Sequence, residues 1–270
     1  MDPLPRSAPA PSPAVSQTLR IAAGARTDVG AVRSENQDAF GVLPAIAIAS
    51  GDVVGRVVPQ PAVFAVADGM GGHEAGAEAS NVAVDAMMGA FGPGFRSQPD
   101  RLALMQAAIT AANDAVWARA NAGSYVRQMG TTCTLLLVAD GQAYLGHVGD
   151  SRAYRVRGEE IVQMTTDHTL GEAARHDPSL AEIARTRAHH LTRAIGIREH
   201  VEVDVVRAGA LRAGDRFVLC SDGLAPVSAD EIVRSVHRYS PQEAADWLVT
   251  LASTLGSRDN ATAVVVQVAP

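Results

Sequence analysis

Apolar residues follow two different periods along the chain, and the period changes at sharp boundaries. Short apolar runs bounded by turn residues predict strands at residues 19–25 and 62–67. Alanine-rich segments with apolar side chains at helical spacing predict two helices that pack together, at residues 77–90 and 101–120. The first half of the chain therefore mixes strands with a pair of helices.

An antiparallel meander is predicted next, because Asp-Gly and Gly-Asp turns separate β-rich runs. Its strands are expected at residues 132–139, 142–148, 152–157 and 160–164. Further elements are helical and irregular structure at 168–190, strands at 201–206, 216–220 and 261–268, and helices at 229–238 and 241–255. Strands in antiparallel groups with helices in pairs predict an α+β layered sandwich whose helices cover the outer faces of the sheets, and not a doubly wound parallel sheet.

The predicted domain organisation is a tail followed by one domain. Residues 1–18 are rich in Pro, Ala and Ser and have almost nothing to bury, so a flexible tail is expected there. Residues 19–270 show no repeat, no charge block and no second linker, which favours a single domain. An excursion at 43–61, which alternates apolar stretches with Gly and Pro, is either a hairpin that binds a partner or a tolerated surface insertion.

Composition narrows the classes of partner. Hydrophobic residues make up 47% of the 270-residue chain and aromatic residues only 4%, so the core must consist of Ala, Val, Leu and Ile. A net charge of -6 and the lack of a Lys/Arg stripe argue against nucleic acid. No run approaches the roughly 20 apolar residues of a membrane span, and the N-terminus does not resemble a secretion signal, so a cytoplasmic setting without membrane contact is expected.

The two cysteines predict buried structural thiols. Cys133 and Cys220 each lie within an apolar run, where a thiol behaves as a small hydrophobic side chain. A nucleophilic thiol needs an electropositive setting, and Asp222 beside Cys220 has the opposite sign. The sequence therefore argues against a thiol phosphatase mechanism.

Aspartates recur at the ends of predicted strands. Asp68 ends a buried apolar run and precedes a glycine-rich loop, where backbone can approach a cation closely. One such Asp-Gly pair is usually a turn. Four more aspartates repeat the arrangement, however, without an obvious salt-bridge partner in sequence: Asp38, Asp150, Asp222 and Asp259. The joint pattern favours a metal site over five independent turns.

The type of ligand indicates the type of metal. Carboxylate and carbonyl oxygens, without paired His or Cys, select hard octahedral ions such as Mg²⁺ or Mn²⁺ and argue against zinc. Converging carboxylates repel one another, and two divalent ions about 3.5 to 4 Å apart would neutralise them and activate a water molecule. Two ions per chain are therefore expected.

These motifs, in this order, resemble bacterial members of the protein phosphatase 2C family, which are metal-dependent serine/threonine phosphatases. The resemblance covers nearly the whole chain after the tail. The matching segments are Thr27-Asp28-Val-Gly30-Ala-Val-Arg33-Ser-Glu-Asn36-Gln37-Asp38-Ala39-Phe40, Val66-Ala-Asp68-Gly69-Met-Gly-Gly-His73, Met129-Gly130-Thr131-Thr132, Val148-Gly-Asp150-Ser-Arg152, Thr166-Asp167-His168, Leu191-Thr-Arg-Ala-Ile-Gly196, Cys220-Ser-Asp222-Gly223-Leu224 and Asp259-Asn260.

The resemblance implies a four-layer α-β-β-α sandwich, in which two mainly antiparallel sheets lie between pairs of helices, with a binuclear Mn²⁺ or Mg²⁺ centre at one end. Asp68 would bridge both metals, and the Gly69 carbonyl would join one of them. Asp38, Asp222 and Asp259 would complete the coordination, directly or through water. The substrates would be phosphoserine and phosphothreonine in proteins, which places the enzyme opposite a cognate Ser/Thr kinase.

Two further side chains acquire catalytic roles from the resemblance. Arg33 would grip the substrate phosphate, a role that its bidentate guanidinium suits, and the alternative is a surface salt bridge with Glu35. His73 would protonate the departing serine or threonine oxygen, and the alternative is a loop histidine without a titrating role.

The chain departs from the family pattern in two places. Pro226 stands where many relatives carry an acidic residue that helps to hold a third metal, so a third ion on Asp150 and Asp222 is left open. The segment at about 168–192, which forms a flap beside the cleft in relatives, is rich in His and Arg and unlike the usual pattern, so substrate choice is expected there. Two alternative functions remain: a hydrolase of small phosphoesters, and a catalytically weak or inactive module that binds partners.

Overall fold

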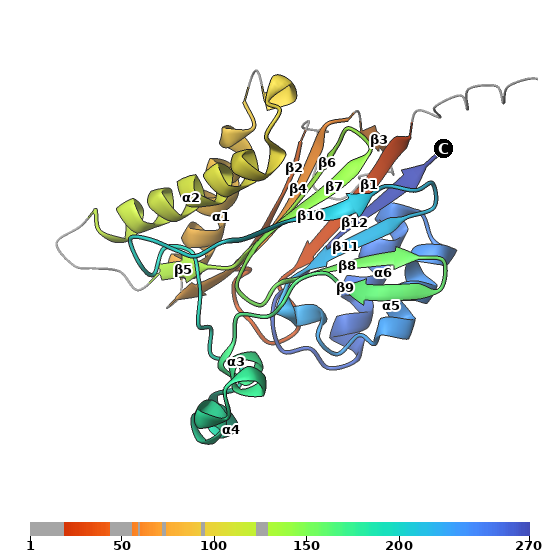
Figure 1. Ribbon diagram of the computed structural model, residues 1–270. Coiled ribbons are helices and arrows are strands. Elements are labelled where there is room, and N and C mark those ends of the chain that lie inside the picture. The colour runs from red at the N-terminus through yellow and green to blue at the C-terminus, as the bar shows by residue number, and fades with distance from the viewer. Residues whose placement is uncertain (1–18, 44–55, 59, 72–73, 93–94, 123–128) are drawn as a thin grey trace, which may run out of the picture.

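The computed structural model describes residues 19–43, 56–58, 60–71, 74–92, 95–122 and 129–270. The tail expected at 1–18, most of the excursion at 43–61 and the candidate acid His73 lie outside the described residues. The described part forms two antiparallel sheets that face each other, with helices on both outer sides (Figure 1).

The first sheet contains both ends of the described chain. Its strand order is β3-β1-β12-β11-β8-β9, and each neighbouring pair is antiparallel. The strands are β1 (Arg20–Asp28), β3 (Arg56–Val58), β8 (Arg152–Arg157), β9 (Glu160–Gln163), β11 (Arg216–Cys220) and β12 (Ala261–Ala269). The central strands β11 and β12 are almost entirely buried, as strands covered on both faces must be.

The second sheet holds the expected meander. Its order is β10-β7-β6-β4-β2, and the short strand β5 pairs with the end of β4. The strands are β2 (Asp38–Leu43), β4 (Ala62–Gly71), β5 (Met129–Thr131), β6 (Cys133–Ala139), β7 (Gln142–Val148) and β10 (Asp204–Ala210). The Asp140-Gly141 turn between β6 and β7 has positive φ at both residues, which is the hairpin geometry that Asp-Gly favours.

A pair of helices covers each outer face. The helices α1 (Glu74–Ala90) and α2 (Arg101–Ala120) pack on each other and on the second sheet, where Met105, Ile109 and Val116 are fully buried. The helices α5 (Ala229–Arg238) and α6 (Pro241–Thr254) cover the first sheet. Ser240 begins α6 with a capping box to Glu243, which satisfies free backbone donors of the first turn.

A third apolar core lies between the two sheets. Phe64 and Leu136 from the second sheet meet Phe217, Leu219 and Val266 from the first, and all five are buried. The α+β fold and the four-layer α-β-β-α order predicted from the sequence are confirmed.

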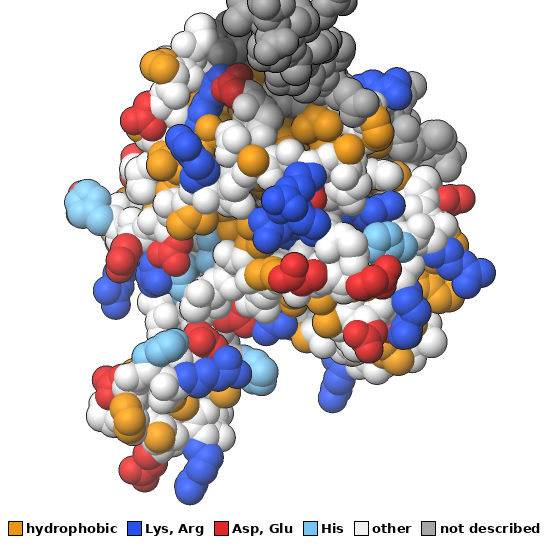
Figure 2. Space-filling model, turned by 45° about the vertical axis from the view of Figure 1, so that its right-hand side comes forward, with side chains coloured by type: hydrophobic (Ala, Val, Ile, Leu, Met, Phe, Trp, Pro, Cys, Tyr) orange, Lys and Arg blue, Asp and Glu red, His pale blue; other side chains and the backbone are white. Residues whose placement is uncertain are grey.

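A small helical lobe projects from one end of the sandwich, and Figure 2 shows that it carries side chains of both charges. It consists of α3 (Leu170–His176), a 3-10 turn (Pro178–Leu180) and α4 (Ala181–Arg187). Its two ends are tied together by an isolated bridge between Thr169 and Leu191. This lobe is the flap segment that the sequence predicted at about 168–192.

Several predicted boundaries were wrong. The strand expected at 201–206 is β10, which begins at Asp204 and ends at Ala210, and the helix expected from residue 77 begins at Glu74. β2 and β5 were not predicted, because β2 lies at the edge of its sheet with Gly41 inside it, and β5 has only three residues. None of the described helices combines the length and hydrophobicity that crossing a bilayer requires.

Candidate active site

Two of the predicted metal ligands are direct neighbours across the second sheet. Asp38 begins β2 and pairs in register with Asp68 in β4. The Oδ2 atom of Asp38 accepts hydrogen bonds from the hydroxyls of Ser221 and Thr262, both at 2.7 Å. Its Oδ1 atom is buried and has no hydrogen-bond partner. A buried carboxylate oxygen without a donor is costly unless it receives a proton or a cation.

Hydrogen bonds hold the backbone of Asp68 on both sides. The Asp68 N–H donates to Thr132 Oγ1 at 2.9 Å, and the Asp68 carbonyl accepts from Thr132 N and Thr131 Oγ1, each at 2.9 Å. Gly69 N donates to the Gln37 carbonyl at 3.0 Å. A Cβ on Gly69 would collide with the backbone of Gly76 and Gln37, so only glycine fits here.

The other two predicted ligands come from the first sheet. Asp222 follows β11 at the start of a 3-10 turn (Asp222–Leu224), and Asp259 lies just before β12. Asn260 fixes this corner: its Oδ1 accepts from Gln37 N, and its Nδ2 donates to the carbonyls of Val29 and Glu35, each at 2.8 Å. The facing edges of the two sheets therefore bring Asp38, Asp68, Asp222 and Asp259 to one place.

Burial and mutual repulsion raise the pKa values of these carboxyl groups. The pKa of Asp38 rises to about 6, chiefly through burial, although its two hydroxyl donors oppose the shift. Burial and repulsion from Asp38 and Asp222 raise the pKa of Asp68 well above its usual value. Partial removal from water and repulsion from Asp259 raise the pKa of Asp222. Each of these carboxyl groups therefore ionises less readily than an exposed one, and nearby cations would favour the charged form.

The guanidinium of Arg33 lies beside this cluster. Its Nη2 atom lies 2.5 Å from Asp259 Oδ2, and both side chains are substantially exposed. The sequence offers Asp259 no nearby salt-bridge partner, and the fold supplies one because it joins two residues that are far apart in the chain. The structure also places the Arg33 guanidinium on Asp259 and not on Glu35. This exposed pair costs little to separate, so Arg33 remains available to an anion in the cleft.

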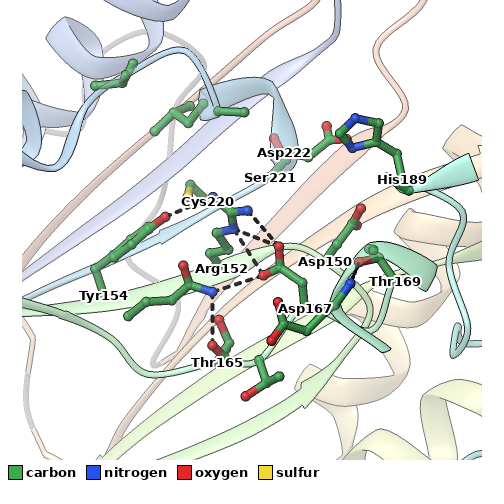
Figure 3. A pocket seen from close by; sticks show the side chains of 18 of the residues that line it. Asp150, Arg152, Tyr154, Thr165, Asp167, Thr169, His189, Cys220, Ser221 and Asp222 are labelled. Atoms are coloured by element: carbon green, nitrogen blue, oxygen red, sulfur yellow. Dashed lines mark hydrogen bonds and ion pairs between the residues drawn. The ribbon is translucent and has the colours of Figure 1, made fainter. Parts of the chain in front are cut away.

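Asp150 lies between this cluster and a pocket of about 780 Å³ beneath the lobe (Figure 3). Its pKa is raised to about 7 by burial and by repulsion from Asp222 and Asp167. Within the pocket, Arg152 forms a bidentate pair with Asp167, with a shortest distance of 2.6 Å. Figure 3 shows the imidazole of His189 beside Asp222 at the pocket edge.

A cleft of about 860 Å³ opens over the acidic cluster. It is lined by the four residues Arg33, Asp68, Asp222 and Asp259, by Gly69, and by the segment 189–202. Within the described part of the chain, no three His, Cys, Asp or Glu side chains are arranged so that they could hold one ion. The carboxylates are gathered, but the coordination geometry is not complete.

Both cysteines are buried, as the sequence predicted. Cys133 is fully buried and Cys220 is 3% exposed. Burial raises the pKa of Cys220 to about 12, so the thiol stays protonated at neutral pH. Neither thiol is placed to act as a nucleophile.

Three supporting residues received no role from the sequence. Ser221 and Thr262 hold Asp38, and Asn260 holds the loop that carries Arg33. The sequence contains a sign of the role of Thr262, because it is a polar residue within the apolar run of β12. The structure shows that it is fully buried. Asn260 left none beyond its position after Asp259, since its partners are backbone groups more than 200 residues away.

The fold and the site together define a layered α+β protein with a cleft in which carboxylates and a guanidinium lie close together. The sequence profile of the protein phosphatase 2C family matches residues 34–267. The chain therefore belongs to the protein phosphatase 2C family.

Individual relatives agree with this assignment. The chain is 34% identical over 256 residues to the serine/threonine protein phosphatase PstP of Mycobacterium tuberculosis, a match that covers 93% of this chain and 46% of PstP. It thus spans about half the length of that relative. The serine/threonine phosphatase stp of Listeria innocua is 32% identical, with 90% of this chain and 94% of stp covered.

Solved structures show the same similarity. The crystal structure of M. tuberculosis PstP superposes with a TM-score of 0.77 at 33% identity and covers 93% of this chain and 100% of that one. The catalytic domain of PstP in complex with two manganese ions gives a TM-score of 0.74 at 35% identity, with 94% and 100% covered.

Proposed function

We propose that this chain hydrolyses phosphoserine and phosphothreonine in proteins and that it uses two divalent cations, Mn²⁺ or Mg²⁺, to do so. The observation that carries the proposal is the set of neighbouring carboxylates at the floor of the cleft, with a guanidinium beside them. Relatives that share about a third of the sequence are named serine/threonine phosphatases, and one was solved with two manganese ions.

The residues present fit a pair of hard cations. The oxygen-only donor set suits Mn²⁺ or Mg²⁺. Oδ1 of Asp38 is buried without a hydrogen-bond partner, and burial together with repulsion from neighbouring carboxylates raises the pKa values of Asp38 and Asp68. Bound cations would give the Oδ1 atom of Asp38 a partner and offset the repulsion between the carboxylates. Small movements of the exposed side chains of Asp222 and Asp259 would complete the coordination.

The residues that would hold the cations are Asp38, Asp68, the Gly69 carbonyl, Asp222 and Asp259. When bound, the cations would neutralise charge on the phosphoryl oxygens and make a nearby water more acidic. Pro226 offers no oxygen side chain beside Asp222, so a third ion at Asp150 stays a secondary proposal.

The remaining chemistry is proposed for two side chains. Arg33 would leave Asp259, orient the substrate phosphate with its bidentate fork, and neutralise charge that develops in the transition state. His73 would deliver a proton to the departing oxygen, a role that stays a proposal because this residue lies outside the described part of the chain. Residues 19–270 would act as one phosphatase domain.

An inactive partner-binding module is the weaker alternative. Such a module gains nothing from carboxylates that repel one another, because each raises the free energy of the folded, metal-free protein.

Phosphorylated proteins are the proposed partners of this chain. A Ser/Thr kinase is the proposed opposing enzyme, and the cytoplasm is the proposed location.

The proposal is tested with a phosphothreonine peptide. We expect phosphate release with Mn²⁺ or Mg²⁺, none after chelation, and a loss on the order of 10²–10³-fold in Asp222→Asn, because that substitution removes a proposed ligand. Asp230→Asn is the matched control, since Asp230 is an exposed residue in the first turn of α5. Full activity in the presence of chelator would contradict the two-metal proposal.

A further inference from the structure

Two parts of the chain line the cleft. One is the proposed metal site with its carboxylates, and the other is the segment 189–202. This segment brings the guanidinium groups of Arg193 and Arg198, the carboxylate of Glu202 and three imidazole rings to the cleft. Glu199 lies next to Arg198 in the chain. We call residues 196–202 the basic wall, after its guanidinium Arg198.

The basic wall is held rigidly by a buried asparagine of α2. Asn113 is 1% exposed, and its Nδ2 donates to the carbonyls of Arg198 at 3.1 Å and Glu199 at 2.9 Å. Its Oδ1 accepts from Gly196 N at 2.9 Å. Gly196 has φ of +80°, and a Cβ there would collide with Val116, so the turn that begins the wall requires glycine.

The wall is also connected directly to the acidic cluster. Ile195 and Thr131 exchange two backbone hydrogen bonds, at 3.1 and 2.9 Å, and Thr131 Oγ1 donates to the carbonyl of Asp68. Figure 1 shows the segment from the lobe to β10 passing beside β5. The position of the wall relative to Asp68 is therefore set by hydrogen bonds and does not depend on the projecting lobe.

Arg198 is the cation of this wall that has no internal partner. Arg193 pairs with Asp204 at 2.7 Å, and Arg33 pairs with Asp259. The Arg198 side chain is exposed within the cleft and forms neither an ion pair nor a hydrogen bond among the described residues. Beside it, Ile197 presents an apolar surface that is 46% exposed. A fixed backbone with a free guanidinium is suited to bind an anion from outside.

We propose that the basic wall, through Arg198, makes this chain select phosphopeptides that carry a second anionic group next to the phosphoresidue. The second group is another phosphate or an acidic side chain, since a guanidinium binds both. The inference rests on the proposed function, because the first phosphate must occupy the metal side of the cleft. A flanking residue then reaches the part of the cleft that the wall lines, where the guanidinium of Arg198 has no internal partner among the described residues.

The test compares kcat/KM for four phosphothreonine peptides with Mn²⁺ present. They differ only in the flanking residues, which are neutral, glutamate, a second phosphothreonine, or lysine. We expect the glutamate and doubly phosphorylated peptides to exceed the neutral one by about three- to tenfold, and the lysine peptide to be the poorest. The preference should shrink as ionic strength rises, because exposed charges are screened.

Variants assign the preference to the wall. Arg198→Ala should bring the four kcat/KM values together, because the values for the two anionic peptides fall and the value for the lysine peptide rises toward that of the neutral peptide. Arg198→Lys should keep part of the preference. The matched control Arg185→Ala, on the exposed face of α4, should behave as the wild type. Equal rates for all peptides in the wild type, or a preference that survives Arg198→Ala, would overturn the inference.

Failure of the proposed function looks different. If no peptide is hydrolysed under any metal condition, the phosphatase proposal fails. The wall is then judged from binding of the same four peptides to the Mn²⁺-loaded protein, where an unchanged Kd across the set would overturn it as well.

Discussion

Two sets of buried aspartates in this molecule have opposite surroundings. Asp215 is 1% exposed, and Arg157 approaches both of its carboxylate oxygens at 2.7 Å, while Arg212 N donates to Oδ2 at 2.8 Å. Asp38 is also buried, but it receives only two hydroxyl donors, and its Oδ1 has none. Burial is common to both, so burial alone does not mark a functional site.

The compensation of charge is what separates them. Asp215 lies beside a guanidinium that neutralises it, so it serves the fold by joining β8 to the turn before β11. Asp68 lies among other carboxylates that raise its pKa. Such an arrangement favours positive charge from outside the chain, which the proposed cations would supply.

The largest expected effect comes from neutralising one member of the uncompensated set. Asp68→Asn should lower phosphopeptide hydrolysis by on the order of 10²–10³-fold, because it removes a proposed ligand. The same change should raise the Tm of the metal-free protein, because it removes repulsion from Asp38 and Asp222. Activity assays with Mn²⁺ and thermal unfolding in chelator measure the two effects, and a lower Tm would contradict the view that this charge is uncompensated.

The compensated aspartate should respond in the opposite way. Asp215→Asn leaves Arg157 without its carboxylate, so we expect the free energy of unfolding to fall by about 2–3 kcal/mol, as when one partner of a buried pair is removed. Activity below the unfolding transition and the stabilisation by Mn²⁺ should be retained. Denaturant titration measures the free energy of unfolding and its increase with Mn²⁺, and enzyme assay measures the activity. A selective loss of activity in a fully folded Asp215→Asn protein would break the distinction between the two sets.

The sequence alone identified part of the uncompensated set. The strand-end positions of Asp68 and Asp222 were visible, since an apolar run followed by Asp-Gly is a local signal, whereas Asp38 begins the unpredicted strand β2. The layered fold was visible too, because the antiparallel meander and the paired helices depend on local periodicity.

The sequence did not reveal contacts between residues that are far apart in the chain. The pairing of Arg33 with Asp259 joins residues 226 positions apart, and Asn113 reaches the basic wall across more than 80 positions. Nothing in the local pattern around Arg33 or Arg198 distinguishes the arginine that has an internal partner from the one that has none. The roles assigned to the site residues, His73 above all, stay predictions that the variants must decide.

The smallest expected effect concerns Asp150, which is partly exposed and near the edge of the uncompensated set. In an unfolded chain its carboxyl group ionises near pH 4, whereas in the folded, metal-free protein its pKa is about 7. Between these values the folded state binds more protons than the unfolded state, so the free energy of unfolding falls as pH rises and the loss is complete above about pH 7.

Asp150→Asn should abolish this fall in the free energy of unfolding with rising pH. The variant should therefore match the wild type near pH 4 and exceed it by about 1 kcal/mol above pH 7, a modest value because solvent screens this partly exposed group. Taking the difference between the two proteins cancels the contribution of His147, whose pKa burial lowers to about 4 and which acts in the opposite direction. Denaturant titrations in chelator from pH 4.5 to pH 8 measure the difference, and one that stays constant across this range would show that Asp150 belongs with the compensated aspartates.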